Sequence, residues 1–334
     1  MTIVVRSPES LITAVPYLLG FRPQESLVAV GVRDRAVMQV VRFDLPTDAG
    51  PDWLADVITL LRRGGAGEFH LLGYADRAPC GPVLAVLGRR LRRAGFVVSP
   101  VIVVTEDHWS HARCPSRRCC PPGGRPLAPD DSVAAEFVGR GSAPLPSRDA
   151  LAASVAPVPR VSTGSGDLSS GDWSPAIEDW RDLADVDASW TPEPARVHRL
   201  ALSLTDRAWR DALLRTFVPG LLGVDGLPPE YVSWAEAAVG PPRAPFGDWL
   251  ARRERVVIDR LILVARRSPA PLAAGTYTTL GVVAAMWGHG ALANLALEQA
   301  LRTDPDYVLA RLTLQVLGLG MPLAPLSSPG ADVG

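Results

Sequence analysis

The side chains best suited to metal or thiol chemistry lie in one short stretch, between Phe96 and Leu127. His108 and His111 are followed by Cys114, Cys119 and Cys120, three of the chain's four cysteines, in the run H-x2-H-x2-C-x4-C-C. Zn²⁺ takes such ligands in tetrahedral sites, usually from two separated pairs of short spacing. This run lacks the two pairs, and adjacent cysteines rarely both bind one ion, so zinc is one hypothesis among three.

The other two hypotheses concern the thiols themselves. Cys114 and Cys119 could form a redox pair, because Arg113, Arg117 and Arg118 would lower the pKa of a neighbouring thiol. Alternatively the thiols pack as small apolar side chains. We favour packing over the redox pair. Four cysteines in a chain without a secretory leader are more typical of thiols or metal ligands than of disulfides.

Acidic side chains follow several predicted strands. Asp44, Asp76 and Asp107 carry the oxygen ligands that Mg²⁺ prefers. Acids at strand ends also form turns and cap helices, and that interpretation is the more common one. No glycine-rich phosphate loop and no Gly-x-Ser-x-Gly motif occurs, so the sequence contains no complete catalytic motif.

The first half of the chain alternates strands with helices. Strands are predicted at Thr2–Arg6, Ser26–Arg33, Ala36–Phe43, Glu68–Tyr74 and Val97–Val104, and helices from Ser7 to Gly20, at Pro51–Arg63 and at Pro82–Arg93. We therefore expect residues 1–154 to form an α/β domain, a mixed and mostly parallel sheet flanked by helices on both faces. Residues 105–127 are expected to be a cysteine-rich loop.

This topology predicts a shared edge. Ligands bind outside the carboxyl ends of parallel strands, and right-handed crossovers would align the strands ending at Asp44, Tyr74 and Glu106. The segment that enters the strand at Ser26 lies at the same edge. We expect a ligand-binding rim formed by Arg22, Gln24, Glu25, Ser26, Asp44, Asp76, Asp107 and Trp109, with the cysteine-bearing loop beside it.

The second half of the chain is predicted to be helical. Residues 155–194 are rich in proline and polar residues and are expected to be a linker or mobile loop. Residues 195–320 form the helical domain, with helices at Ala195–Phe217, Glu230–Val239, Phe246–Arg267, Thr276–Trp287, Ala291–Arg302 and Tyr307–Leu317. Within residues 274–307, Tyr277, Leu280, Gly281 and Ala284 follow the spacing of a tetratricopeptide repeat, so one repeat-like hairpin is expected.

Two motifs carry a resemblance to a known family. The stretches AVPYLLGFRPQESLVAVGV, Ala14 to Val32, and CCPPGGRPL, Cys119 to Leu127, resemble the bacterial domain-of-unknown-function family numbered 4192. The likeness extends over most of the chain. The family has no established activity, so the resemblance implies no catalytic residues.

The net charge and the apolar segments of the chain indicate which classes of binding partner to expect. The net charge is −1, from 34 basic and 35 acidic residues, which argues against nucleic acid and anionic membranes. No leader and no membrane span is recognisable, so we expect a cytoplasmic protein. We expect it to bind a small ligand at the rim or a protein partner through the helical domain; the alternative is a metal-assisted hydrolase or a thiol-dependent enzyme using the rim.

Overall fold

A computed structural model describes residues 7–34, 36–46, 49–75, 80–112, 114–139, 141–158, 173–218, 226–240 and 248–320, with the backbone alone for residues 248–251. The chain divides into two compact units, residues 1–150 with 318–321, and residues 151–317 with 322–334. The strand predicted at Thr2–Arg6, the rim residue Asp76 and Arg113 lie outside the described residues.

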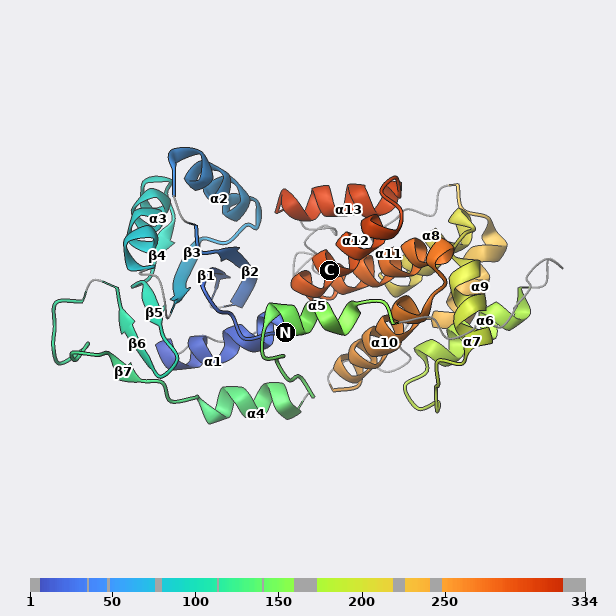
Figure 1. The fold of residues 1–334 in the computed structure, drawn as a ribbon, viewed down its shortest axis with the longest axis horizontal. Helices are drawn as coiled ribbons and strands as arrows, with labels where there is room; N and C mark the ends of the chain where they lie inside the picture. The colour runs from blue at the N-terminus through green and yellow to red at the C-terminus, as the bar shows by residue number, and fades with distance from the viewer. Residues whose placement is uncertain are drawn as a thin grey trace, which may run out of the picture. The chain divides into compact units, whose positions relative to one another are not determined.

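The first unit has the predicted alternation of strands and helices (Figure 1). Its elements are α1 (Pro8–Leu19), β1 (Ser26–Arg33), β2 (Ala36–Asp44), α2 (Pro51–Arg63), β3 (Glu68–Tyr74), α3 (Gly81–Arg93), β4 (Val97–Val98), β5 (Ile102–Val104), β6 (His108–His111), β7 (Arg125–Pro126) and α4 (Asp131–Gly139). A further helix, α5 (Arg148–Val155), begins at the end of this unit.

The strands form one mixed sheet, which confirms the predicted fold class. The strand order is β2-β1-β3-β5-β6-β7, with β4 also paired to β3. The pairs β3–β4 and β3–β5 are parallel, whereas β1–β2, β1–β3, β5–β6 and β6–β7 are antiparallel. The described sheet therefore has more antiparallel pairs than the mostly parallel arrangement we expected, because chain reversals follow both β1 and β5.

Two details of the last strands differ from the prediction. The strand expected over Val97–Val104 is divided into β4 and β5, because Pro100 between them has no N–H to donate to a neighbouring strand. The expected loop 105–127 contains β6 and β7. Both strands extend the sheet beyond β5, so the cysteine segment is held at its two ends by strand pairing.

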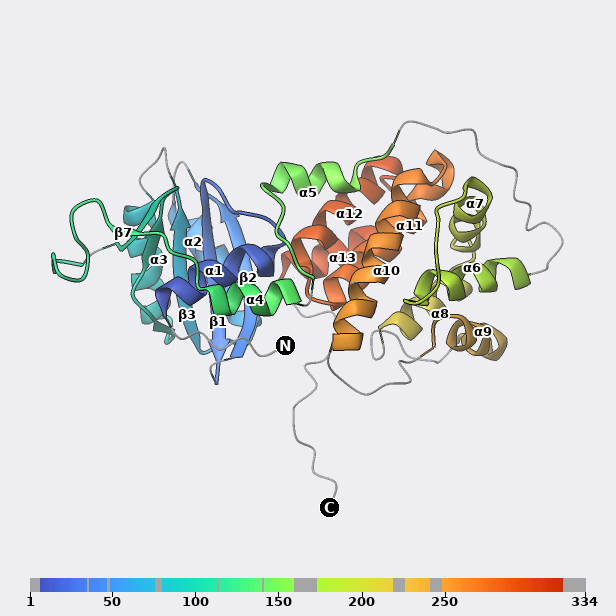
Figure 2. The same ribbon diagram turned by 90° about the horizontal axis from the view of Figure 1, so that it is seen from below.

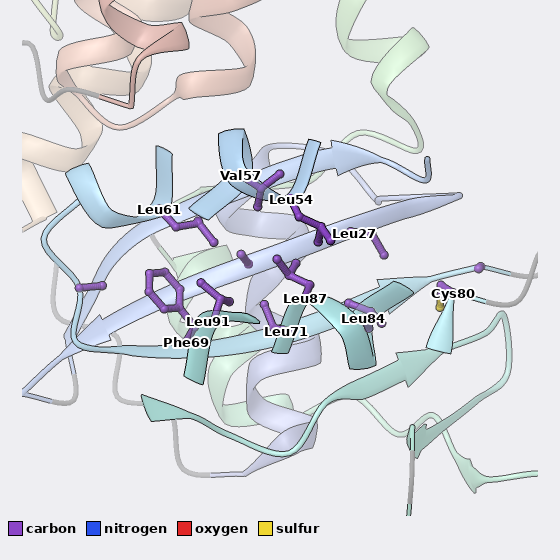
Figure 3. Packing of buried hydrophobic residues seen from close by; sticks show 13 residues of the cluster. Leu27, Leu54, Val57, Leu61, Phe69, Leu71, Cys80, Leu84, Leu87 and Leu91 are labelled. Carbon is purple, nitrogen blue, oxygen red and sulfur yellow. The ribbon is translucent and has the colours of Figure 1, made fainter. Parts of the chain in front are cut away.

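Helices cover both faces of the sheet, as predicted. Figures 1 and 2 show α2 and α3 on one face and α1 and α4 on the other. Figure 3 shows apolar side chains of α2 and α3 packed on those of β1 and β3. The labelled members of this core are Leu27, Leu54, Val57, Leu61, Phe69, Leu71, Cys80, Leu84, Leu87 and Leu91.

The helix α1 begins where the sequence predicts. The Ser7 side chain accepts a hydrogen bond from the Ser10 N–H at 3.1 Å, and Pro8 occupies the first helical position. Pro16 is tolerated inside the helix, which ends at Gly20 with a φ of 79°. The chain then passes directly into the segment of Arg22 and Gln24, so α1 places that segment beside β1.

The second unit is helical in its described residues, and its helices differ from the prediction in three places. They are α6 (Ser174–Ala184), α7 (Pro194–Ser203), α8 (Arg207–Phe217), α9 (Pro229–Val239), α10 (Asp248–Arg267), α11 (Ala270–Met286), α12 (Gly290–Thr303) and α13 (Val308–Gly318). The stretch expected as a linker contains α6, the helix expected over Ala195–Phe217 is divided into α7 and α8, and α11 begins six residues before Thr276.

The predicted hairpin in this unit is formed by α11 and α12. Leu280, Ala284, Ala293 and Leu297 are fully buried, as the repeat spacing requires of its packing residues. Its kinship with the tetratricopeptide repeat stays a prediction. No helix among the described residues is both long and apolar enough to cross a membrane.

Candidate functional site

The sheet register brings several predicted strand ends to one edge. Ser26 at the start of β1 pairs with Asp44 at the end of β2 and with Tyr74 at the end of β3. Tyr74 also pairs with Val104 at the end of β5. β2, β3 and β5 therefore end together, next to the residue at which β1 begins.

A cavity of about 510 Å³ opens at this edge, on the face of the sheet that α1 and α4 cover. Arg22 and Gln24 line it together with the ends of β3 and β5. The remaining lining comes from α1, from the segment after β7, from α4 and from the segment between α4 and α5. The full set is Ile12, Thr13, Pro16, Tyr17, Arg22, Pro23, Gln24, Tyr74, Ala75, Val104, Thr105, Glu106, Leu127, Pro129, Ala134 and Pro144.

The Tyr74 side chain is the unusual feature of this cavity. It is 8% exposed, and its hydroxyl is buried without a hydrogen-bond partner among the described residues. Burial raises the pKa of Tyr74 well above its usual value, so the phenol is protonated and can donate a hydrogen bond. A residue that lines a cavity and has an unpaired hydroxyl can offer that hydroxyl to an acceptor bound there.

The segment before β1 is held by backbone hydrogen bonds. The N–H of Arg22 donates to the Leu145 carbonyl at 2.9 Å, and the Leu145 N–H donates to the Gly20 carbonyl at 2.9 Å. Glu25 has a φ of 41°, in the left-handed region, which turns the chain into β1. These contacts place Arg22 and Gln24 at the mouth of the cavity, with both side chains exposed.

Other predicted rim residues lie at the edge without lining the cavity. Ser26 is fully buried, and its hydroxyl donates to the Gln24 carbonyl at 2.5 Å and accepts from Arg42 Nε at 2.9 Å. Asp44 is 87% exposed and forms an ion pair with Arg42 at 2.6 Å. Asp107 is exposed. Asp76 lies outside the described residues, so the predicted magnesium site of Asp44, Asp76 and Asp107 stays a prediction.

The cysteines lie at the other end of β5, and the expectation that they join the rim is wrong. Thr105 and His108 close a tight turn, in which the Thr105 N–H donates to the His108 carbonyl at 2.8 Å. β6 therefore runs back along β5, with Trp109 opposite Val104 and His111 opposite Ile102. The turn residues Glu106 and Asp107 were the sequence signal for this reversal.

The three thiols form a compact group. The Sγ atoms of Cys114, Cys119 and Cys120 all lie within 4.8 Å of one another. The amide N–H groups of Cys119 and Cys120 donate to the Ser116 carbonyl at 3.1 and 2.8 Å, which folds the segment into a tight turn. The thiols are half-buried, and the expectation that they pack as small apolar side chains stays a prediction.

Hydrogen bonds couple the protonation of the thiols. A backbone hydrogen bond with Ser116 is the largest effect that lowers the pKa of Cys114, and hydrogen bonds with the other two thiols lower it further. The pKa of Cys119 is raised, chiefly by its hydrogen bond with Cys114. The neighbouring thiols thus stabilise the first thiolate that forms in the group. Forming a second thiolate costs more free energy.

A second cavity, of about 470 Å³, adjoins the thiols. It is lined by Ala85, Arg89, Arg92, Pro100, Val101, His111, Ala112, Cys114 and Cys119. His111 lies on β6 beside the buried ring of Trp109, with ring centroids 5.3 Å apart. His108 is exposed and Trp109 lines neither of these two cavities, so of the two histidines His111 alone adjoins the thiols.

A comparison with models of protein families shows to which family the chain belongs. Residues 8–222 and 247–323 match the model of a family described as a domain of unknown function, DUF4192. The chain belongs to that family. Comparisons with curated proteins and with solved structures gave no match. Both cavities of this DUF4192 chain are formed by residues inside the first matched segment.

Sequence reasoning missed the contribution of α1 to the first cavity of the DUF4192 chain. Thr13 and Tyr17 lie one helical turn apart and line the cavity, although the apolar spacing of α1 predicts a face packed entirely on the sheet. The signal was the polar group that each of the two residues carries in the apolar part of the helix, after its first turn.

Proposed function

We propose that the chain binds a small organic molecule with an apolar body and a hydrogen-bond acceptor, in the cavity beside α1. The Tyr74 hydroxyl carries this proposal, because the Tyr74 residue lines the cavity and its hydroxyl is buried without a partner in the described structure. Leaving such a group unsatisfied costs about 1–3 kcal/mol. A ligand acceptor would recover that free energy.

The lining favours a particular ligand chemistry. Ile12, Val104 and Leu127 present apolar surface, which suits a hydrophobic or aromatic body. Arg22 at the mouth can donate charge-assisted hydrogen bonds to an anion. A small aromatic carboxylate combines these features, with its acceptor oxygens toward Tyr74 and Arg22.

Ligand-observed NMR with benzoate, 1-naphthoate and the matching neutral alcohols tests the proposal. We expect the carboxylates to bind the wild-type chain more tightly than the alcohols. Ala134→Phe should abolish this binding because Ala134 lines the cavity. The neighbouring Ala135 is exposed on the same helix, so Ala135→Phe is a matched control that should bind as the wild type does.

Two further variants test the assigned roles. Tyr74→Phe and Arg22→Ala should each weaken carboxylate binding by about tenfold, the equivalent of about 1.4 kcal/mol. Arg22→Ala should remove the preference for carboxylates over alcohols. Equal binding by wild type and Ala134→Phe, or no binding of any probe by the wild type, would contradict the proposal.

The protein contacts expected of the helical unit remain a separate prediction. Val308 and Leu312 lie one turn apart on α13 and are 54% and 51% exposed, which marks them as the first positions to test. The hydrolase and thiol-enzyme alternatives have no assembled catalytic group at the first cavity among the described residues. We therefore favour binding over catalysis there.

A further inference from the structure

We propose that Cys114, Cys119, Cys120 and His111 bind one Zn²⁺ ion, which fixes the segment between β6 and β7. This inference concerns the opposite end of β5 from the first cavity and does not depend on the proposed ligand. It rests on the arrangement of the thiols, on the imidazole beside them, on the charges around them and on the way the segment folds.

The thiols already have the spacing of a metal site. Sulfur ligands of a tetrahedral zinc, with Zn–S distances of about 2.3 Å, lie about 3.8 Å apart. The three Sγ atoms lie within 4.8 Å of one another without an ion, so shifts of about 1 Å would bring the three sulfur atoms to ligand spacing. The two chain neighbours Cys119 and Cys120 both belong to this group, which answers the objection that adjacent cysteines rarely share an ion.

His111 is the candidate fourth ligand; its ring nitrogens lie outside the compact group of the three sulfur atoms, so the ring must move toward them to bind the same ion. It lines the same cavity as Cys114 and Cys119. Its Nδ1 atom is buried and has no hydrogen-bond partner among the described residues. A neutral imidazole is a common zinc ligand, and a bound ion would satisfy the nitrogen that the protein leaves unpaired.

The backbone around the group supports thiolates. The His111 N–H donates to Cys120 Sγ at 3.4 Å, an outer contact that orients and stabilises a metal-bound sulfur. Arg125 on β7 donates to the Cys119 carbonyl at 2.7 Å and stacks on Trp109 of β6 at 5.7 Å. Both strands are thereby joined to the thiol segment by contacts outside the ligand set.

The charged side chains named below are positive, which suits an anionic metal complex. Three thiolates and one neutral imidazole around Zn²⁺ carry a net charge of −1. Arg89 and Arg92 of α3 line the same cavity as Cys114 and Cys119, and Arg125 donates to the Cys119 carbonyl. These guanidinium groups lower the free energy of the negative complex.

The segment needs an anchor because it has little core of its own. Residues 115–118 are exposed, and β7 consists of two exposed residues. Gly123 and Gly124 both have a φ of 87°, and a Cβ at Gly124 would lie 2.9 Å from the Trp109 carbonyl oxygen. A structural zinc supplies the free energy that apolar burial does not supply in such a segment.

Metal analysis of the full chain, purified and kept under reducing conditions, tests the proposal directly. We expect about one zinc per chain, and substitution with Co²⁺ should give the intense sulfur-to-cobalt charge-transfer band of thiolate ligation. Cys114→Ser, Cys119→Ser and Cys120→Ser should each lower zinc affinity by at least about a hundredfold, and His111→Asn by about tenfold or more.

Matched controls come from the same chain. Cys80 is buried in the core away from the group, so Cys80→Ala should retain the zinc. His108→Asn changes an exposed imidazole on the same strand as His111 and should also retain it. Circular dichroism of each variant separates loss of the ion from loss of the fold, because the described residues between β6 and β7 form no helix.

Trypsin provides a second readout that needs no variant. Arg117 and Arg118 are exposed and lie between the ligands Cys114 and Cys119. Removing the ion with a chelator should accelerate cleavage after these two arginines by at least about tenfold, and added Zn²⁺ should reverse the effect.

The proposal would be overturned by any of three results. The first is a reduced wild-type chain that binds no zinc when the ion is supplied. The second is a disulfide among Cys114, Cys119 and Cys120 in protein handled without oxygen, detected by mass spectrometry after thiol alkylation. The third is a rate of cleavage after Arg117 and Arg118 that is the same with zinc and with chelator.

Discussion

Two buried tyrosine hydroxyls differ in whether they have a partner. Tyr277 donates to the Val155 carbonyl at 2.8 Å, whereas the Tyr74 hydroxyl has no partner in the described structure. Tyr277→Phe should therefore lower the free energy of unfolding by about 1 kcal/mol, and Tyr74→Phe should leave it unchanged or raise it by up to about 1–3 kcal/mol. Urea denaturation of both variants without added ligand measures the difference. A loss in Tyr74→Phe as large as that in Tyr277→Phe would show that the Tyr74 hydroxyl is already satisfied.

The Tyr277 phenol should also make the free energy of unfolding depend on pH. Burial raises the pKa of Tyr277 to about 12, whereas a tyrosine in the unfolded chain titrates near pH 10. The folded chain holds this proton more tightly, so the stabilisation is complete below about pH 10 and is lost as the pH rises toward about 12. Urea denaturation of wild type and Tyr277→Phe over that range should show that the slope with pH is shallower in the variant. Equal slopes would contradict the assignment.

The position of a site residue could be predicted from the sequence where it follows from the direction of a neighbouring strand. Arg22 and Gln24 lie near the ends of β3 and β5 because β1 begins at that edge, and their role in ligand binding stays a prediction. Asp44 lies at the same edge, but its ion pair with Arg42 cannot be derived from spacing along the chain. The position of the cysteines was mispredicted because the turn at Thr105 to His108 reverses the strand direction.

The helix α6 contributes a buried ion pair to the second unit. Asp179 has 5% side-chain exposure and accepts from Arg199 Nε at 2.7 Å and from Arg196 Nε at 3.1 Å, both on α7. Asp179→Ala should cost about 3–5 kcal/mol of unfolding free energy, because it leaves two guanidinium groups without their shared carboxylate.

Asp182 supplies the matched control for this ion pair. It lies one turn along α6, contacts Arg196 at 3.1 Å and is 47% exposed, so Asp182→Ala should cost about 0–1 kcal/mol. Chemical denaturation compares the two variants. Similar losses of unfolding free energy in both variants would mean that the burial of Asp179 does not strengthen its ion pairs with α7.

The hairpin of α11 and α12 depends on close helix packing at Gly281. A Cβ at this position would lie 2.6 Å from Leu297 Cγ, so Gly281→Ala should destabilise the chain by about 1–3 kcal/mol despite the better helix propensity of alanine. At Gly290, also helical, a Cβ would meet nothing within 4 Å, and Gly290→Ala should be neutral or stabilising. Thermal unfolding of both proteins distinguishes them, and equal melting temperatures would rule out the close approach.

Helices with a clear polar face were easier to predict than buried ones. α2 has the predicted bounds, Pro51 to Arg63, because a proline begins it and glycines follow it. α11 was predicted too short because most of its length is buried on every side, which removes the periodic signal. The break between α7 and α8 is set by the Asp206 side chain, which accepts from the N–H groups of Ala208 and Trp209, while the apolar pattern continues through it.

At the scale of the molecule, one sheet carries two candidate sites with different chemistry. The cavity at the carboxyl ends of β3 and β5 offers a phenol and a guanidinium to an organic ligand, and the thiols at the start of β5 offer soft ligands to a metal. Because β5 and β6 connect the two sites, loss of the metal could displace Trp109, which pairs with Val104 in the wall of the cavity. The two proposals can still be tested separately, because they share no side chain.

The division into two units predicts how the whole chain unfolds. Leu71 is fully buried in the core of the first unit and Leu213 in that of the second, so each leucine-to-alanine change should cost about 2–5 kcal/mol within its own unit. If each core is a separate cooperative unit, calorimetry should resolve two transitions, with Leu71→Ala lowering the temperature of one and Leu213→Ala that of the other. A single transition that both variants shift equally would mean that the two cores unfold together, and a stability change measured in one unit would then report on the entire chain.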